Sequence, residues 1–112
     1  MALTVNGNTI ETTEAGYLVD LNEWNEDVCA AIAKEEGIEI TDKHLDVITY
    51  LRDEYINNGG SQPMERAITK HMSNVWGEKL KGKDLYNLFP GAPSKQGLKL
   101  AGLPATTRKG GY

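Results

Sequence analysis

The hydrophobic pattern begins with a short stretch, residues 3–10, in which β-favouring residues lie on both sides of the Asn6-Gly7 pair. An Asn-Gly pair in this setting is the strongest short signal for a type I′ hairpin turn. We therefore predict a small N-terminal β-hairpin. A two-stranded ribbon is marginally stable alone, so we expect this hairpin to lie against helices.

Apolar residues then recur three and four positions apart, which is the spacing of one buried stripe on a helix. A first helix is predicted over residues 26–36, because Asn25 is a suitable N-cap and Gly37 a suitable stop. Acidic residues follow the cap, where negative charge suits the helix dipole. The predicted buried positions of this helix are Val28, Cys29, Ile32 and Ala33.

A second helix is predicted to open at Thr41 and to end in the polar run of residues 57–60. Its residues at the three-and-four spacing are Leu45, Ile48, Leu51, Arg52 and Tyr55. We interpret its carboxylates as a solvated face rather than an acid/base pair. These carboxylates are Asp42, Asp46, Asp53 and Glu54.

After that break, Ser61 or Gln62 is expected to cap a third helix with Pro63 in its first turn, where the missing N–H costs nothing. The predicted buried stripe of this helix is Ile68, Met72, Val75 and Trp76. Gly77 and Gly82 interrupt the pattern.

Two short helical segments close the pattern. Asp84 is expected to cap a turn over residues 85–89, which ends before Pro90. Ser94 is expected to cap a last helix over residues 95–101, with Gly102 as its stop.

These elements predict a mainly α fold: a small helical bundle, helix-turn-helix-like, with an N-terminal β-hairpin and a flexible C-terminal arm. With 112 residues the chain can form one modest core but not two independently stable domains. We expect a single domain over residues 1–104. Residues 105–112 are polar, glycine-rich and cationic, and are expected to form a mobile tail.

The charges are divided between the two halves of the chain. Residues 1–56 hold 13 acidic and 3 basic residues, whereas residues 57–112 hold 3 acidic and 9 basic residues. The basic half could steer the protein toward an acidic protein surface or a phosphate backbone. Alternatively, the two halves could complement each other within the fold. The net charge of −4 argues against a general nucleic-acid binder.

Few residues could carry chemistry. The single cysteine, Cys29, cannot form an internal disulfide, and the two histidines, His44 and His71, leave no zinc-ligand spacing. Cys29 has acidic and apolar neighbours, which favours a buried, inert thiol. Both histidines are interpreted as surface or boundary residues. No nucleotide-binding or nucleophile motif occurs, so we expect a non-catalytic protein without metal or cofactor.

The chain has no apolar run near the roughly 20 residues of a membrane span. Its first residues also lack the basic-then-apolar layout of a signal peptide. We therefore expect a cytoplasmic protein that does not interact with membranes.

The C-terminal region carries a distinctive set of motifs: Leu-Tyr-Asn-Leu-Phe-Pro at 85–90, Pro-Ser-Lys-Gln at 93–96 and Ala-Gly-Leu-Pro at 101–104. Together they resemble the C-terminal signature of the DsrC/TusE family of sulfur-relay proteins. Further matches in the family's order are residues 16–18, Trp24, residues 36–38, Arg52, Tyr55, Pro63, Arg66 and Lys70. The resemblance covers nearly the whole chain.

The resemblance implies a compact helical bundle with an N-terminal hairpin and a C-terminal arm that inserts into a partner. In the family, a cysteine near the chain end carries persulfide sulfur, and DsrC proteins use a second cysteine upstream. Here the upstream position is Leu98, and the terminal position is Lys109 by spacing or Gly111 by counting from the end. A side chain without sulfur cannot form a persulfide or disulfide.

We therefore expect a protein that docks to sulfite reductase or sulfurtransferase subunits without carrier thiols, and that modulates or competes with a thiol-bearing relative. Arg66 and Lys70 are the expected docking residues. Residues expected to shape the arm are Lys95, Gln96, Gly102, Leu103 and Pro104. The free protein is expected to be a monomer.

An alternative reading of the same pattern is a helix-turn-helix regulator of sulfur-metabolism genes. It would use the helices between Thr41 and Trp76, with Arg66 and Lys70 facing DNA. The acidic overall charge counts against it.

Overall fold

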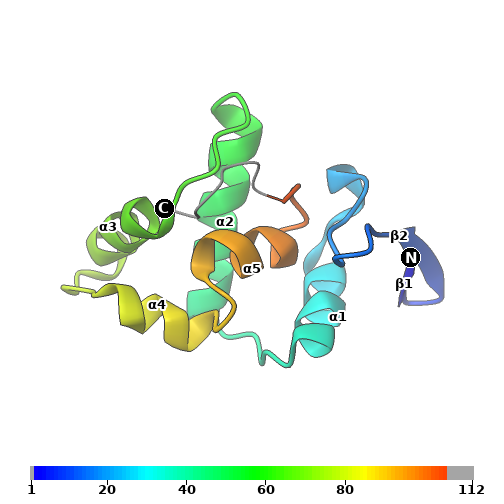
Figure 1. Cartoon of the computed structure of the whole chain (residues 1–112), viewed down its shortest axis with the longest axis horizontal. Coiled ribbons are helices and arrows are strands. Elements are labelled where there is room, and N and C mark those ends of the chain that lie inside the picture. The colour runs from blue at the N-terminus through cyan, green and yellow to red at the C-terminus, as the bar shows by residue number, and fades with distance from the viewer. Residues whose placement is uncertain (1, 106–112) are drawn as a thin grey trace.

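The computed structural model describes residues 2–105 of the chain and confirms a mainly helical protein with an N-terminal hairpin (Figure 1). The elements, in chain order, are β1 (Ala2–Val5), β2 (Asn8–Glu11), the 3-10 turn η1 (Leu21–Glu23), α1 (Glu26–Glu36), α2 (Asp42–Asn57), α3 (Glu65–Trp76), α4 (Gly82–Leu88) and α5 (Pro93–Leu100). Of the predicted mobile tail, only Ala105 lies among the described residues. No helix within residues 2–105 is both long and apolar enough to cross a membrane.

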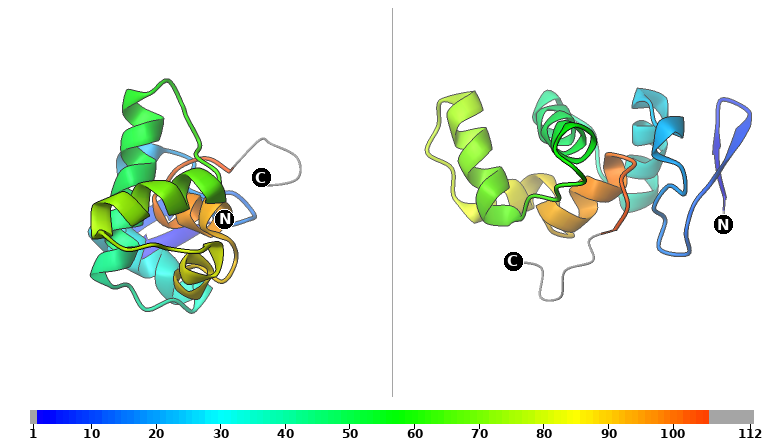
Figure 2. Two further views of the ribbon diagram at one scale, coloured as in Figure 1. Left: turned by 90° about the vertical axis from the view of Figure 1, so that its left-hand side faces the viewer. Right: turned by 90° about the horizontal axis from the view of Figure 1, so that it is seen from above.

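The last helix, α5, lies at the centre of the molecule and contacts all four other helices (Figures 1 and 2). Seen from above in Figure 2, α3 and α4 lie at one end of the long axis and the hairpin at the other. Gly97 allows α5 to approach α2 closely, because a Cβ at this position would lie 2.8 Å from Leu51 Cδ1. Helix α5 therefore forms the middle of the core.

The predicted hairpin and first helix are both confirmed. Strands β1 and β2 pair in antiparallel register, and Asn6 and Gly7 both have positive φ, as a type I′ turn requires. Helix α1 has the predicted bounds: the Asn25 side chain accepts a hydrogen bond from the Val28 amide, and Gly37 adopts the left-handed conformation. The buried residues of α1 are the four predicted: Val28, Cys29, Ile32 and Ala33.

Helix α2 also has the predicted bounds, but the prediction of its buried face was partly wrong. The buried residues are His44, Val47, Ile48 and Leu51, whereas three of the predicted stripe residues are only half-buried: Leu45, Arg52 and Tyr55. His44 is thus not a surface or boundary residue. Its Nδ1 accepts a hydrogen bond from the Thr41 amide, and its Nε2 lies 2.8 Å from the Leu88 carbonyl oxygen. These two partners turn the imidazole inward.

The predicted start of the third helix was wrong. Helix α3 begins at Glu65, two residues after Pro63, and no side chain caps it. Ser61 cannot cap it from this distance, and Gln62 uses its amide on the chain segment after α5. The predicted stripe is buried only in part, because Val75 is 53% exposed. Trp76, also placed in that stripe, is half-buried, since its indole bonds to Asp46 on the surface of α2.

The caps of the last two helices also differ from the prediction. Helix α4 begins at Gly82, so Asp84 lies inside the helix, where it accepts a hydrogen bond from the Lys81 amide at 2.8 Å. Helix α5 begins one residue before Ser94, which therefore lies in its first turn and is buried. A buried partner, Glu65, holds Ser94 there and replaces the capping bond that was predicted.

Candidate partner-binding site

The chain after α5 leaves the core through a tightly bonded turn. Gly102 has φ of 70°, and its amide donates to the Lys99 carbonyl at 3.1 Å. The Leu103 amide donates to the Leu98 carbonyl at 3.0 Å, and both leucine side chains are fully buried. This is a Schellman motif with its apolar contact, so Gly102 stops α5 as predicted and Leu103 anchors the following segment.

Two side chains from other elements hold this turn. The Trp24 indole donates to the Leu100 carbonyl, and the Arg52 guanidinium donates to the Ala101 carbonyl, each at 2.7 Å. The guanidinium also lies over the Trp24 ring, 4.4 Å from the ring centroid. Burial lowers the pKa of Arg52 from its ordinary value. Trp24 and Arg52 therefore satisfy carbonyls at the end of α5 and fix the direction of the chain beyond it.

Sequence patterns alone did not assign this role to either residue. Arg52 fell within a helical stripe, and Trp24 stood alone before a helix. The partner of Arg52 lies 49 positions away in the sequence and the partner of Trp24 lies 76 positions away. Helical periodicity therefore gives no indication of either contact.

The segment beyond the turn is tied to the connection between α2 and α3. The Gln62 side chain donates to the carbonyls of Pro104 and Ala105, at 3.2 and 3.4 Å. Pro104 and Ala105 are themselves exposed. The chain therefore reaches the surface beside Gln62.

Arg66 and Lys70, the predicted docking residues, lie next to this exit. Both are exposed, and neither side chain forms an ion pair or hydrogen bond with another residue in the described part of the chain. They line an open hollow of about 630 Å³. Its other lining residues are Ser61, Gln62, Pro63, Met64 and Ala67. The structure thus brings together Arg66, Lys70 and Pro104, through Gln62.

Gln96, by contrast, lies on the side of α5 that faces α1, and both ends of its amide are bonded. Its Nε2 donates to Glu36 at 3.2 Å, and its Oε1 accepts from the Gly91 amide at 2.9 Å. Gln96 therefore links the α4–α5 connection to α1. Lys95, next to it, is exposed on the surface of α5.

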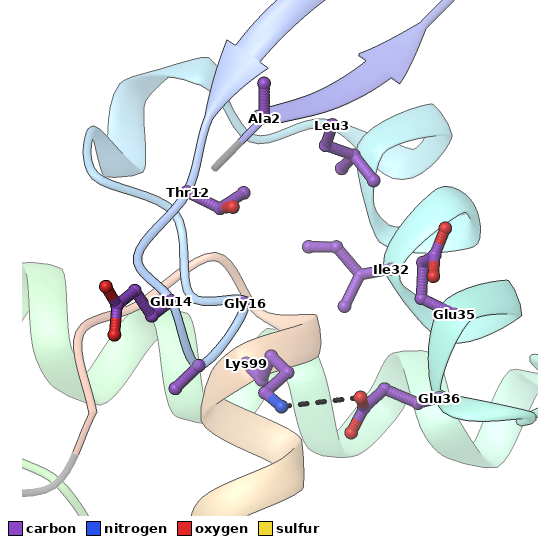
Figure 3. A pocket seen from close by; sticks show the side chains of 10 residues that line it. Ala2, Leu3, Thr12, Glu14, Gly16, Ile32, Glu35, Glu36 and Lys99 are labelled. Carbon is purple, nitrogen blue, oxygen red and sulfur yellow. Dashed lines mark hydrogen bonds and ion pairs between the residues drawn. The ribbon is translucent and has the colours of Figure 1, made fainter.

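Glu36 also receives an ion pair from Lys99 at 3.3 Å (Figure 3). The Lys99 ammonium lies 5.2 Å from the centroid of the Tyr17 ring, and burial, followed by the Glu36 charge, raises the pKa of Tyr17. A hollow of about 370 Å³ lies above this ion pair, between the hairpin, α1 and α5 (Figure 3). Since the charges are already paired, we assign this cluster to joining α5 and α1.

A buried carboxylate, missed by the sequence reasoning, holds the start of α5. Glu65 is 6% exposed, and its Oε1 accepts bonds from the amide and the hydroxyl of Ser94. Its other oxygen has no hydrogen-bond partner among the described residues. The two residues stand 29 positions apart, so only the fold reveals the pair.

The native cysteine, Cys29, and the upstream position of a carrier cysteine, Leu98, are both buried. Leu98 is 0% exposed and Cys29 is 1% exposed. Burial, followed by the charge of Glu26, raises the pKa of the Cys29 thiol to about 11. Lys109 lies outside the described residues.

The connection between α2 and α3 bears on the DNA-binding alternative. It runs over residues 58–64, longer than the turn of about three to four residues found in DNA-binding helix-turn-helix motifs. The length of this connection therefore counts against that alternative.

Comparison with known proteins places these features in a family. A family model described as DsrC like protein matches residues 4–108. The sulfurtransferase TusE homolog of Haemophilus influenzae is 44% identical over 103 residues, which cover 91% of this chain and 94% of that protein. The sulfurtransferase TusE of Escherichia coli K12 is 41% identical over 103 residues, with the same coverage of both chains.

Solved structures share the fold. The NMR structure of Allochromatium vinosum DsrC is 38% identical, with a TM-score of 0.85, and the match covers 96% of this chain and 98% of that one. The crystal structure of the oxidized gamma-subunit of the dissimilatory sulfite reductase (DsrC) from Archaeoglobus fulgidus is 35% identical, with a TM-score of 0.89 and the same coverage.

Proposed function

The chain belongs to the DsrC/TusE family of sulfur-relay proteins, and on this premise we propose that it docks to a partner in sulfur metabolism without carrying sulfur itself. The observation that carries the proposal is the position of the only cysteine. Cys29 is 1% exposed, and its pKa of about 11 leaves the thiol protonated at neutral pH. A protonated thiol in the core neither attacks nor accepts sulfur.

The positions that correspond to carrier cysteines by family resemblance are Leu98 and Lys109. Leu98 fills the core of the bundle, where the leucine supports packing. Neither side chain contains sulfur, so neither can form a persulfide or a disulfide. The proposal therefore assigns no catalytic residue to this chain.

Docking is assigned to the surface beside the chain exit. Arg66 and Lys70 supply unpaired positive charge there, and Lys95 adds exposed charge on α5. Gly102, Leu103 and Pro104 direct the segment that leaves the core. Gln96 acts indirectly, because both ends of its amide are bonded within the protein.

The names of the relatives point to the kind of partner. One group is named sulfurtransferase, and the Archaeoglobus protein is named as a subunit of dissimilatory sulfite reductase. We assign the partner of this chain to the same two kinds of protein. A chain that occupies the docking site of a thiol-bearing relative but cannot transfer sulfur acts as its competitor or modulator.

A pull-down from native cell extract, read by mass spectrometry, tests this function. The full chain is compared with a chain that ends at Ala105, because a deeper truncation would remove α5 from the core. The expected result is recovery of sulfurtransferase or sulfite reductase subunits by both chains, because the assigned docking residues all precede position 105, with weaker recovery by the shortened chain, which lacks Arg108 and Lys109. Recovery of neither by the full chain would contradict the proposal.

A restored thiol gives the matched control. Lys109→Cys places a thiol at the terminal carrier position given by the resemblance, and Cys29→Ala removes the native thiol. Persulfide labelling by the captured partner is expected on the Lys109→Cys chain and not on the parent chain. Labelling of Cys29 in the folded parent chain would show that this protein carries sulfur after all.

A further inference from the structure

We propose that the hollow between Gln62 and Lys70 binds an acidic segment of a partner protein, alongside the point where the chain leaves α5. The proposal rests on the docking function above and deepens it by naming the chemistry of the partner. The hollow, of about 630 Å³, lies at the start of α3. It falls within the size range of protein ligand sites, roughly 300–1,000 Å³.

The charge of the hollow is uncompensated. Arg66 and Lys70 are one helical turn apart on α3, so their side chains lie on the same face. Within residues 2–105 the salt bridges join Lys43 to Glu78 and Lys99 to Glu36, and neither reaches this surface. Two neighbouring cations without a partner repel each other, and carboxylates from another protein would relieve that repulsion.

The rest of the lining favours a peptide over a nucleic acid. Pro63, Met64 and Ala67 supply apolar surface, which suits an apolar side chain next to a carboxylate. A phosphate backbone needs a longer track of cations than two residues.

The hollow is continuous with the chain exit. Gln62 lines it and also bonds the carbonyls of Pro104 and Ala105. A partner segment in the hollow would therefore lie beside the residues that follow α5. The same partner would then bind both surfaces at once. Because the two contacts are linked, the affinity for the pair exceeds the affinity for either surface alone.

NMR titration of the isotope-labelled full chain tests the proposal. The probe is the capped peptide acetyl-Glu-Leu-Glu-Glu-Leu-Glu-amide, and the matched probe has every Glu replaced by Gln. At low salt, the acidic peptide is expected to shift the amide signals of Gln62, Arg66 and Ala67, and the Gln peptide is not. Equal shifts with both peptides, or no shift with either, would overturn the proposal.

Two double variants locate the site. Arg66→Glu with Lys70→Glu is expected to weaken binding of the acidic peptide by at least about tenfold. Lys79→Glu with Lys83→Glu makes the same change in net charge on exposed residues outside the hollow, and is expected to change binding by no more than about twofold. If both double variants weaken peptide binding equally, the peptide responds to the net charge of the protein and not to a site in the hollow.

A short single-stranded oligonucleotide is the third probe. If it shifts the same amides with a steep salt dependence while the acidic peptide does not, the hollow is a nucleic-acid site and the proposal is wrong. The titration needs no cellular partner. A failed pull-down with a positive titration would therefore reject the sulfur-relay partner and leave the acidic-segment site in place.

Discussion

The indole ring of Trp24 lies where a side chain at position 102 would stand. A Cβ built on Gly102 would come within 2.5 Å of Trp24 Cδ1, a separation that real Cβ atoms do not show. Gly102 also has φ of 70°, which L side chains rarely adopt. Two independent constraints therefore require glycine at the turn where the chain leaves α5.

Gly102→Ala is accordingly expected to be strongly destabilising. The left-handed backbone costs about 1–2 kcal/mol with a side chain, and the clash with Trp24 adds about 1–3 kcal/mol. Gly77→Ala is the matched control, because Gly77 ends α3 with φ of 63° and has nothing within 4 Å of the added Cβ. Urea unfolding measures both variants. Equal losses of unfolding free energy would mean that Trp24 yields to the new methyl group.

The two tryptophans allow a second comparison. Trp24→Phe removes the indole N–H that donates to the Leu100 carbonyl at the half-buried end of α5, and is expected to cost about 1–3 kcal/mol of unfolding free energy. Trp76→Phe removes a bond to the exposed Asp46 carboxylate, which water can replace, and is expected to cost about 0.5 kcal/mol. Thermal or urea unfolding separates the two. A larger loss of unfolding free energy for Trp76→Phe would contradict the role of Trp24 in holding the end of α5.

Cys29 predicts a pH dependence of stability. Its pKa is about 11 in the folded protein and 9.0 ordinarily, so the unfolded chain releases the thiol proton first as pH rises. The stabilising contribution of the buried, protonated thiol to the free energy of unfolding is therefore fully present below pH 9 and is lost as the pH rises toward 11. The urea midpoint of the native chain, relative to that of Cys29→Ala, is expected to fall across this window. A difference that stays constant between pH 8 and about 11 would contradict the burial of the thiol.

Local signals in the sequence were sufficient for the elements whose contacts are local. Asn25 and Gly37 bracket α1, and Asn6-Gly7 sets the hairpin turn; in each case the determining bonds lie within a few residues. The fold class and the stop at Gly102 were predicted for the same reason, whereas the family was predicted from its resemblance in the C-terminal motifs.

Three of the errors share one physical cause, which is a polar side chain with a distant partner. His44 bonds to Leu88, and Glu65 bonds to Ser94, so helical periodicity placed neither of them in the interior. Gln62 was predicted as a cap but bonds across the fold to Pro104. Arg66 and Lys70 were found as candidate docking residues from the resemblance. Their position beside the chain exit required the structure.

A thiol at position 98 tests whether the core of α5 can present sulfur at all. Leu98→Cys in a Cys29→Ala background leaves one cysteine at a site that is 0% exposed. The smaller side chain is expected to cost about 2 kcal/mol through the cavity it leaves. In the folded protein, the thiol is expected to react with a disulfide reagent only through unfolding, so its rate should rise steeply with urea.

Lys95→Cys in the same background is the matched control, because position 95 is exposed on the same helix and should react at once in the folded state. Prompt reaction of Leu98→Cys without urea would mean that the end of α5 opens readily and that position 98 can reach a partner. Slow reaction would mean that a thiol carrier built on this bundle has to loosen the Schellman turn first. The Trp24 and Arg52 contacts would then set the barrier to presenting sulfur from that position.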